Sequence, residues 1–335
     1  MRTGSSQADD PPAVTQQAGP PADAPSAANR LVTWHGDLLV WVDQLGWLRS
    51  LNDWLTAVLV PFRERHQDNL ALELMHGGRW AGHPLHPALS DLPIGLWTGA
   101  TLLDAADRGP APPRGIDGAG VLSAAGILAA GATALTGLSD WTVSNEQDRR
   151  VGLFHGLLNT AALGLQCASL GTRMAGHRGA ARALGAAGLT VAVAAGYLGG
   201  HLVFTKGVMV SRVAWAIGPR RWVRAIPEAD VPDDSPVAVE AEGRQVMLYR
   251  HRGNLYALDN ICSHAGGLLS RGTVADLTVT CPLHGSRFTL SDGCIVRGPA
   301  SQPQPVLRTR IRNGWIEVRG GQPAPRRTAK ERKQP

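Results

Sequence analysis

The sequence predicts a multidomain chain, an all-α bundle of four transmembrane helices followed by an all-β domain of small antiparallel sheets. Two observations lead to this expectation. Residues 118–139, 151–172 and 183–205 each contain no Asp, Glu, Lys or Arg, and each run is longer than the ~20 residues needed to cross a bilayer. From about Trp222 onward the chain instead alternates apolar and polar residues in short segments, as half-buried strands do.

A fourth membrane-crossing segment is expected before these three runs. The uncharged stretch 92–103 is short, but it extends backwards through HPALS to a plausible span. Gly, Ala, Leu and Val are abundant in the runs, which is typical of closely packed membrane helices. A buried bundle in a soluble protein is the alternative, and three uncharged runs of 22 or 23 residues disfavour it.

The regions before and after these two parts differ in composition. Residues 1–29 are rich in Pro, Ala, Ser and Gln and contain no apolar signal-peptide core, so we expect disorder there. Disorder is also expected in the basic tail, residues 321–335. The bundle is expected at 76–210 and the β domain at 220–320.

Residues 30–75 are expected to form amphipathic helices at the membrane interface. This region contains Trp34, Trp41, Trp47 and Trp54 at near-heptad spacing, with charged and polar residues between them. Indole rings prefer the interface between lipid and water, where such a helix can lie. Packing in the core of a soluble helical region explains the same spacing and stays open.

Two loops of the β domain contain the residues with the clearest chemistry. CSHAGG occupies residues 262–267 and CPLHGSRF occupies residues 281–288, which gives the pattern C-x-H, sixteen residues, C-x-x-H. A thiolate and an imidazole from each loop can be directed at one metal centre. A Cys2His2 zinc site uses the same ligand types, but common zinc fingers place two Cys together and then two His.

This pattern resembles the Rieske family, in which two loops each contribute one Cys and one His to a [2Fe–2S] cluster. The resemblance implies that Cys262 and Cys281 bind one iron and that His264 and His284 bind the other. It also implies that both imidazoles expose their second ring nitrogen to solvent or to a partner. Zinc is colourless, so an optical spectrum distinguishes the two kinds of site.

Residues beside the four expected ligands fit the same resemblance. Gly266, Gly267 and Gly285 let the backbone approach the inorganic sulfides, so that N–H groups can hydrogen-bond them. Ser286 matches the quinol-oxidising members, in which this hydroxyl donates to a sulfide and raises the reduction potential. We expect a potential within the Rieske range of roughly −150 to +300 mV, below its upper end.

Two differences separate this sequence from the quinol-oxidising and oxygenase members. The loop disulfide of the quinol-oxidising proteins is impossible, because Gly267 and Leu283 occupy the positions of its two Cys. The pattern is therefore closer to Rieske ferredoxins. Rieske oxygenases continue into a long catalytic domain, whereas only the basic tail follows here, so we expect an electron carrier and not an oxygenase.

Residues 75–210 resemble a bacterial family of four-span membrane proteins of unknown function. The resemblance depends on the segments GHPLHPALSDLPIG (82–95), GLSDW (137–141), VGLFHGLLNT (151–160) and GYLGGHLVF (196–204). It implies a membrane location and little more about activity.

Six ionisable residues are expected near one membrane face of this bundle, on the side of the β domain: His83, His86, Asp91, Asp140, His155 and His201. Ionisable groups within spans are rare and usually face a bundle interior or a cofactor. One hypothesis is a second redox centre, with His155 and His201 as axial ligands of a b-type haem. A non-haem metal site with His83 or His86, a quinone pocket, and hydrogen bonds that only join the helices are the alternatives.

The expected function is one-electron transfer by a membrane-anchored Rieske protein, between a quinone, haem or soluble donor and an unknown acceptor. A redox sensor or scaffold without turnover is an alternative, and a quinol-oxidising subunit of a cytochrome bc-like complex is another. Ten basic residues against five favour the cytoplasmic side of a cell membrane for the Rieske domain, and export, suggested by the twin arginines Arg149-Arg150 before an apolar run, is the alternative. The net charge of +6 then indicates contact with anionic lipid and not with nucleic acid. The oligomeric state is not predicted.

Overall fold

The computed structural model describes residues 27–107, 109, 117–216 and 218–320, with side chains from residue 36 onward. Disorder was predicted for residues 1–29 and 321–335, and of these positions only 27–29 are described. The side chain of Trp34 also lies outside the described part of the chain. The chain separates into a first unit, Met1–Trp41, and a second, Val42–Pro335. Helix α1 (Ala27–Gln44) begins in the first unit, which is considered by itself.

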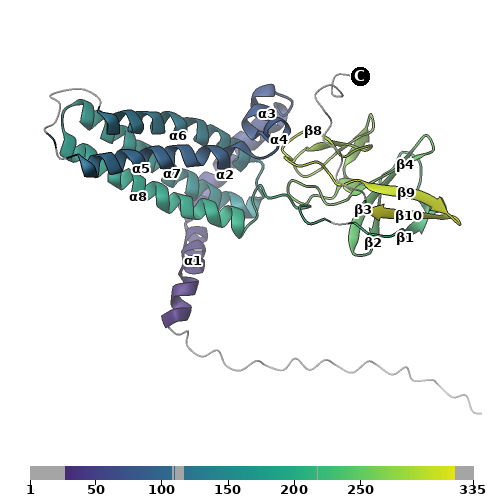
Figure 1. The fold of residues 1–335 in the computed structure, drawn as a ribbon. Coiled ribbons are helices and arrows are strands. Elements are labelled where there is room, and N and C mark those ends of the chain that lie inside the picture. Colours follow the sequence, from purple (N-terminus) through teal and green to yellow (C-terminus); the bar gives the residue numbers. More distant parts are fainter. Residues whose placement is uncertain (1–26, 108, 110–116, 217, 321–335) are drawn as a thin grey trace, which may run out of the picture. The chain divides into compact units, whose positions relative to one another are not determined.

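Four helices lie side by side and form the predicted bundle (Figure 1): α5 (Leu85–Ala106), α6 (Gly118–Thr142), α7 (Glu146–Met174) and α8 (Arg178–Phe204). Short turns join α6 to α7 and α7 to α8, so these neighbours run antiparallel. Among the described helices, α6, α7 and α8 are the three long and apolar enough to cross a membrane. A fourth crossing by α5 stays a prediction.

Small residues and satisfied polar groups hold the bundle together. A side chain at Gly126 of α6 would overlap the Trp97 ring of α5, so this glycine allows close helix packing. The buried Gln166 side chain of α7 donates to the Gly185 carbonyl of α8 at 2.9 Å. Ser169 donates to the Ala181 carbonyl at 2.7 Å. These bonds join α7 to α8 without leaving the polar groups unpaired in an apolar setting.

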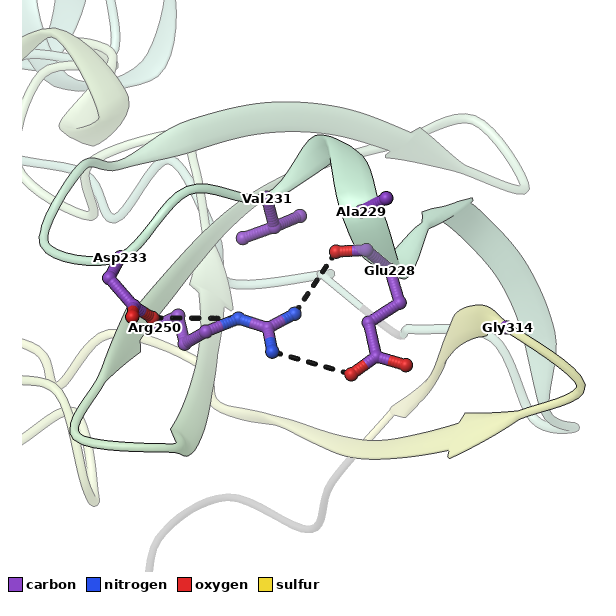
Figure 2. Close-up of a pocket in the computed structure, with 6 residues that line it drawn as sticks. All are labelled: Glu228, Ala229, Val231, Asp233, Arg250 and Gly314. Atoms are coloured by element: carbon purple, nitrogen blue, oxygen red, sulfur yellow. Dashed lines mark hydrogen bonds and ion pairs between the residues drawn. The ribbon is translucent and has the colours of Figure 1, made fainter.

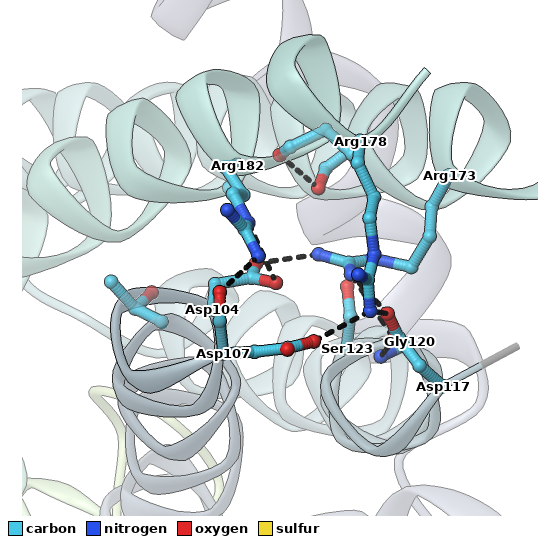
Figure 3. Close-up of polar contacts among 12 residues, drawn as sticks. Asp104, Asp107, Asp117, Gly120, Ser123, Arg173, Arg178 and Arg182 are labelled. Carbon is cyan, nitrogen blue, oxygen red and sulfur yellow. Dashed lines mark hydrogen bonds and ion pairs between the residues drawn. The ribbon is translucent and has the colours of Figure 1, made fainter. Parts of the chain in front are cut away.

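A set of ion pairs joins the helix ends at the α5–α6 and α7–α8 connections (Figure 3). The acidic members are Asp104, Asp107 and Asp117, and the basic members are Arg173, Arg178 and Arg182. Asp117 also caps α6, because its carboxylate accepts the Gly120 N–H at 2.8 Å. The buried Arg173 contacts both Asp104 and Asp117, which links three helix ends.

Three shorter helices precede the bundle: α2 (Gly46–Arg65), α3 (Leu70–His76) and α4 (Gly78–Ala81). Helix α2 exposes Trp47, Trp54 and Phe62, and its buried face contains Leu48, Asn52 and Arg63. The amphipathic interfacial helices expected within 30–75 stay a prediction. Asn69 caps α3 by accepting the Ala71 N–H, and Gly77 ends it with φ of 75°.

The second part of the chain is all-β, as predicted, and consists of three antiparallel sheets. The first sheet has the order β1 (Val223–Pro227), β10 (Trp315–Gly320), β9 (Leu307–Arg312). The second has the order β2 (Val237–Ala241), β3 (Arg244–His251), β4 (Asn254–Asp259). The third has the order β5 (Thr273–Ala275), β6 (Thr278–Thr280), β7 (Arg287–Thr289), β8 (Ile295–Arg297).

The β9–β10 hairpin turns at Asn313-Gly314, as this dipeptide predicts. Both residues have positive φ, 51° and 74°, which suits the twist of a two-residue hairpin loop. Two apolar clusters fill the β domain, and one of them includes Met247, Leu258 and Phe288 together with Cys262 and Cys281. The two cysteines are therefore embedded in the core, which excludes water from the neighbourhood of their sulfur atoms.

Candidate metal centre

The two Cys/His loops share one backbone arrangement. In the first, the Cys262 N–H donates to the Gly267 carbonyl at 2.8 Å and the Gly266 N–H donates to the Cys262 carbonyl at 3.0 Å. In the second, the Cys281 N–H donates to the Ser286 carbonyl at 2.8 Å and the Gly285 N–H to the Cys281 carbonyl at 3.0 Å. Gly266 and Gly285 occupy equivalent positions with φ of 83° and 75°, where other residues are strained.

A third segment, residues 299–304, holds both loops in place. The buried Gln304 accepts the Ser263 N–H at 3.0 Å and donates to the carbonyls of Asp259 and Ile261. The Ser286 hydroxyl accepts the Ala300 N–H at 3.0 Å. Because that hydroxyl acts here as an acceptor, its own hydrogen is available to donate to another group.

The four side chains of the C-x-H and C-x-x-H motifs come together as a sulfur pair and an imidazole pair. The thiol groups of Cys262 and Cys281 are within hydrogen-bonding distance of each other. The rings of His264 and His284 face each other edge to face, with centroids 5.0 Å apart. Among the described residues, no three His, Cys, Asp or Glu side chains converge on a single ion position. The arrangement is thus two pairs, as two irons with two protein ligands each require.

The electrostatic environment keeps the imidazoles neutral. Burial, and then the positive charges of Arg149 and Arg63, together lower the pKa of His284 to about 4. The pKa of His264 is also far below its ordinary value, first because of burial and then because of His284, His76, Arg63 and Arg212. Neutral imidazole is the form that binds metals.

The same environment stabilises a thiolate. The hydrogen bond with Cys262 lowers the pKa of Cys281 to about 7, burial opposes this change, and the backbone N–H groups of Leu283 and His284 assist it. The N–H groups of His264 and Ala265 point at the Cys262 sulfur in the same way, although its bond to Cys281 and its burial raise the pKa of the Cys262 thiol. Thiolate is the form that binds metals.

Two local features show that the four residues fit a metal cluster. The Nδ1 atom of His284 is buried and has no hydrogen-bond partner, so a polar group beside it is needed. A Cβ added at Gly267 would lie 2.9 Å from the Cys281 sulfur and 2.9 Å from the Leu283 Cβ, so only glycine leaves this space open. Positions 267 and 283 are thus adjacent, and none of the four cysteines, all of them among the described residues, forms a disulfide.

The β domain contacts two parts of the helical region, the segment between α2 and α5 and the segment that follows α8. Arg297 donates to the Gly285 carbonyl at 2.9 Å and pairs with Asp68 at 2.7 Å. Gln302 donates to the Gly82 carbonyl at 2.7 Å, and the Arg212 N–H donates to the Ser263 carbonyl at 3.0 Å. His264 is only 8% exposed, so the implied exposure of this ring to solvent is wrong for this structure, because the chain itself covers it.

A buried polar network lies in the same region and was not predicted from the sequence. The Nδ1 of His76 in α3 contacts Asp140 of α6 at 2.9 Å, and its Nε2 contacts Arg63 of α2 at 3.1 Å and Ser139 at 3.2 Å. All four residues are buried. Nothing in the sequence pairs His76 with Asp140, because 64 positions separate them.

The bundle histidines that were proposed as cofactor ligands lie in different settings. The Nδ1 of His155 contacts the Ala195 carbonyl at 2.8 Å, and its ring lies against Gly199. Its ring neighbour is His86, at 6.3 Å between centroids. His83 is exposed and contacts the Pro84 carbonyl. Ligation of haem or a second metal by His155 and His201 stays a prediction.

A separate surface hollow of about 500 Å³ lies in the β domain, away from the two loops. Figure 2 shows that Arg250 points into it and is held by Glu228 and Asp233. Because both carboxylates already pair with this guanidinium, the hollow offers no unpaired cation to an anionic ligand.

Comparison with known proteins places these observations in a family. Residues 221–310 match the model of the Rieske [2Fe-2S] domain. The ferredoxin component of the naphthalene 1,2-dioxygenase system of Pseudomonas putida is 30% identical over 93 residues, which are 28% of this chain and 89% of that protein. The chain belongs to the Rieske [2Fe–2S] family. Its β domain is a Rieske domain, and the cofactor is a Rieske-type [2Fe–2S] cluster, as the sequence pattern predicted.

Other Rieske relatives belong to different electron-transfer systems. The cytochrome b6-f complex iron–sulfur subunit of Chlorobaculum tepidum is 34% identical over 92 residues, which are 28% of this chain and 50% of that protein. The solved ferredoxin of carbazole 1,9a-dioxygenase from Nocardioides aromaticivorans is 28% identical, with a TM-score of 0.29 over 30% of this chain and 98% of that one. By sequence, the chain is related to electron-transfer proteins, a ferredoxin component and a cytochrome b6-f iron–sulfur subunit.

The helical part matches a second family model. Residues 82–212 match a predicted membrane protein family, DUF2231, which agrees with the resemblance seen in the sequence. This match and the three long apolar helices are consistent with a membrane location.

Proposed function

We propose that this chain is a membrane-anchored carrier of single electrons. Cys262 and Cys281 would bind one iron of its cluster, and His264 and His284 the other. The observation that supports this assignment best is the sorting of the four side chains into a sulfur pair and an imidazole pair, with the buried Nδ1 of His284 unpartnered. When bound, the cluster accepts and releases one electron at a time.

The protein's own residues would set the conditions for that exchange. The backbone N–H groups that point at the two sulfurs favour the thiolate form and neutralise part of its charge. The Ser286 hydroxyl has a hydrogen left to donate, while Gly266 and Gly285 give each loop its tight backbone turn. The apolar cluster around both cysteines excludes water. Together these features tune the potential and limit the reorganisation that accompanies electron transfer.

The helical part would anchor the Rieske domain in a cell membrane. The segments are those expected from sequence: interfacial helices at 30–75, a four-span bundle at 76–210 and the Rieske domain at 220–320. The exposed indoles of Trp47 and Trp54 support contact with the lipid interface. The larger number of basic residues on the Rieske side favours the cytoplasm, although Arg108 and Arg114, counted on the opposite side, lie outside the described residues.

The electron donor and acceptor would be a quinone, a haem or a redox protein. A quinol-oxidising role gains support from the likeness to a cytochrome b6-f iron–sulfur subunit. The adjacent positions 267 and 283 oppose it, because they contain no thiols to form the loop disulfide of that class. A sensor or scaffold role gains support from the covered His264 ring, which limits access by a soluble partner. The carrier role accounts best for the ferredoxin relatives.

Spectroscopy on the full chain in detergent tests this proposal. The purified protein should contain two irons and two sulfides per chain, visible absorbance that bleaches on reduction, and a Rieske EPR signal in the reduced state. Cys281→Ser should lose the signal, whereas Cys294→Ser, a matched change of a cysteine outside both loops, should keep it. Zinc in place of iron, or a signal that survives Cys281→Ser, would refute the assignment.

The same sample distinguishes a carrier from a sensor and tests for haem. The reduced protein should transfer electrons to a quinone analogue or to an oxidised ferredoxin on the timescale of enzymatic turnover. Failure with every acceptor would favour sensing. A Soret band that disappears in His155→Ala would support the second redox centre, and its absence in the wild-type protein would exclude haem.

A further inference from the structure

The C-terminal end of α2 lies against the second cluster loop. Gln67, two residues after the helix, places its Oε1 2.8 Å from the position of a Cβ on Gly285. Asp68 pairs with Arg297, and the same guanidinium donates to the Gly285 carbonyl. Arg63 belongs to the last turn of α2 and precedes Gln67, the neighbour of Gly285, by four residues.

Arg63 is a buried cation whose charge is only partly compensated. Arg63 is only 8% exposed, and its Nε has no hydrogen-bond partner. Burial, and then Arg297, lower the pKa of Arg63 to about 10, which leaves the guanidinium charged at neutral pH. A charge in such a setting acts over a longer range than one in water, because the surrounding dielectric constant is low.

The contact with His76 fixes which side of the network is positive. A guanidinium only donates hydrogen bonds, so the Nε2 of His76 accepts from Arg63 and the Nδ1 carries the hydrogen donated to Asp140. The imidazole is then neutral, and it separates the Asp140 carboxylate from Arg63. Besides burial, Arg297, whose guanidinium donates to the Gly285 carbonyl beside His284, lowers the pKa of Arg63, so the charges at this end of α2 and at the second loop interact.

We propose that Arg63, supplied by the helical part of the chain, raises the reduction potential of the Rieske cluster. This inference depends on the proposed binding of the cluster by the two loops. Reduction adds one negative charge at the cluster, and a buried cation nearby stabilises the reduced form more than the oxidised form. Arg63 is thus a positioning residue that acts through its charge, without contact with iron or sulfide.

An EPR-monitored redox titration of the full chain in detergent tests this role. Arg63→Gln should make reduction about tenfold less favourable, which lowers the midpoint potential by about 59 mV for a one-electron couple. Arg63→Lys retains the charge and should restore most of the potential. Arg65→Gln, at an exposed position of the same helix, removes one charge as well and should leave the potential unchanged.

The outcomes separate this inference from the proposed function. If the wild-type protein has no Rieske signal, the cluster assignment fails. If the signal is present but Arg63→Gln keeps the wild-type potential, or if Arg63→Lys lowers it as far as Arg63→Gln does, the role of Arg63 is refuted.

A second variant covers the case in which Arg63→Gln does not fold. Arg212 is exposed, and its Cγ lies 3.9 Å from the Cβ position of Gly266 in the first loop. Arg212→Gln should lower the reduction potential by less than half as much as Arg63→Gln does. The shift caused by Arg212→Gln should disappear at high salt, because salt screens exposed charges. An unchanged potential in Arg212→Gln at low salt would then refute the proposed influence of the helical part.

Discussion

Arg297 joins the second cluster loop to the helical region, because its Nη1 lies 2.7 Å from the Oδ1 of Asp68 while its Nη2 donates to the Gly285 carbonyl at 2.9 Å. These two contacts should contribute differently to stability. The Asp68 side chain is 76% exposed, so the ion pair is screened by water. Gly285 directly follows His284, so the hydrogen bond to its carbonyl fixes the shape of the loop. The loop contact should therefore matter more than the ion pair.

Arg297→Gln should destabilise the loaded Rieske domain by about 1–3 kcal/mol, because the Gly285 carbonyl loses a charged donor. Asp68→Asn should cost only about 0–1 kcal/mol. Loss of visible cluster absorbance on heating measures both variants. Equal losses in the two would show that the docking contact, and not the loop geometry, protects the cluster.

Gly267→Ala should reduce cluster assembly. The added methyl group would lie 2.9 Å from the Cys281 sulfur and 2.9 Å from the Leu283 Cβ, closer than such atoms can approach. We expect less iron per chain and altered EPR g-values. Gly131→Ala, where nothing lies within 4 Å of the new methyl group, serves as the control for expression and folding. Full iron content with unchanged g-values in Gly267→Ala would contradict the geometry.

Ser286→Ala should lower both stability and reduction potential. The Ala300 N–H loses its acceptor in a buried setting, which costs about 1–3 kcal/mol. If the free hydroxyl hydrogen donates to a sulfide, its loss also disfavours the reduced cluster. The exposed Ser291 provides the matched control, Ser291→Ala. A potential equal to that of the wild-type protein would assign Ser286 to loop structure alone.

The cluster loops could be predicted from sequence because their information is local. Two short motifs specify the four candidate ligands, and the equivalent glycines Gly266 and Gly285 supply the positive φ that both loops need. Uncharged runs likewise predicted α6, α7 and α8. These features depend on neighbouring residues, so a single sequence contains them.

Contacts between distant segments could not be predicted in this way. The charge-free runs indicate helices, but they do not specify the rotation of each helix about its axis. They therefore did not indicate that the His155 ring lies beside His86, with 6.3 Å between the centroids. The Arg63–His76 contact likewise depends on how α2 packs beside α3, which the sequence does not specify.

Arg173→Ala should strongly destabilise the helical bundle. The Arg173 side chain is 3% exposed and contacts Asp104 at 2.5 Å and Asp117 at 2.9 Å (Figure 3). Its removal takes a buried cation from the half-buried carboxylates of Asp104 and Asp117 and leaves them only Arg182 and Arg178. We therefore expect a cost of about 3 kcal/mol, the lower end for a broken buried pair. Arg182→Ala is the control, because its side chain is 37% exposed and its Nε lies 3.7 Å from Asp104, so we expect a cost of about 0–1 kcal/mol. Thermal unfolding in detergent, followed by circular dichroism, compares the two.

Asp117 should make the stability of the bundle depend on acid pH. Burial raises the pKa of Asp117, but the hydrogen bonds from Arg178 and the Gly120 N–H outweigh it, so the folded pKa lies below the ordinary value. A depressed carboxyl pKa contributes stability that is fully present above the unfolded pKa of about 3.9 and is lost as pH falls through the folded pKa. The helical unfolding temperature of the wild-type protein should therefore fall below about pH 4. The Asp117→Asn variant should have a lower unfolding temperature above this pH, and its unfolding temperature should fall less as the pH decreases. Parallel curves of unfolding temperature against pH for the two proteins would contradict this role.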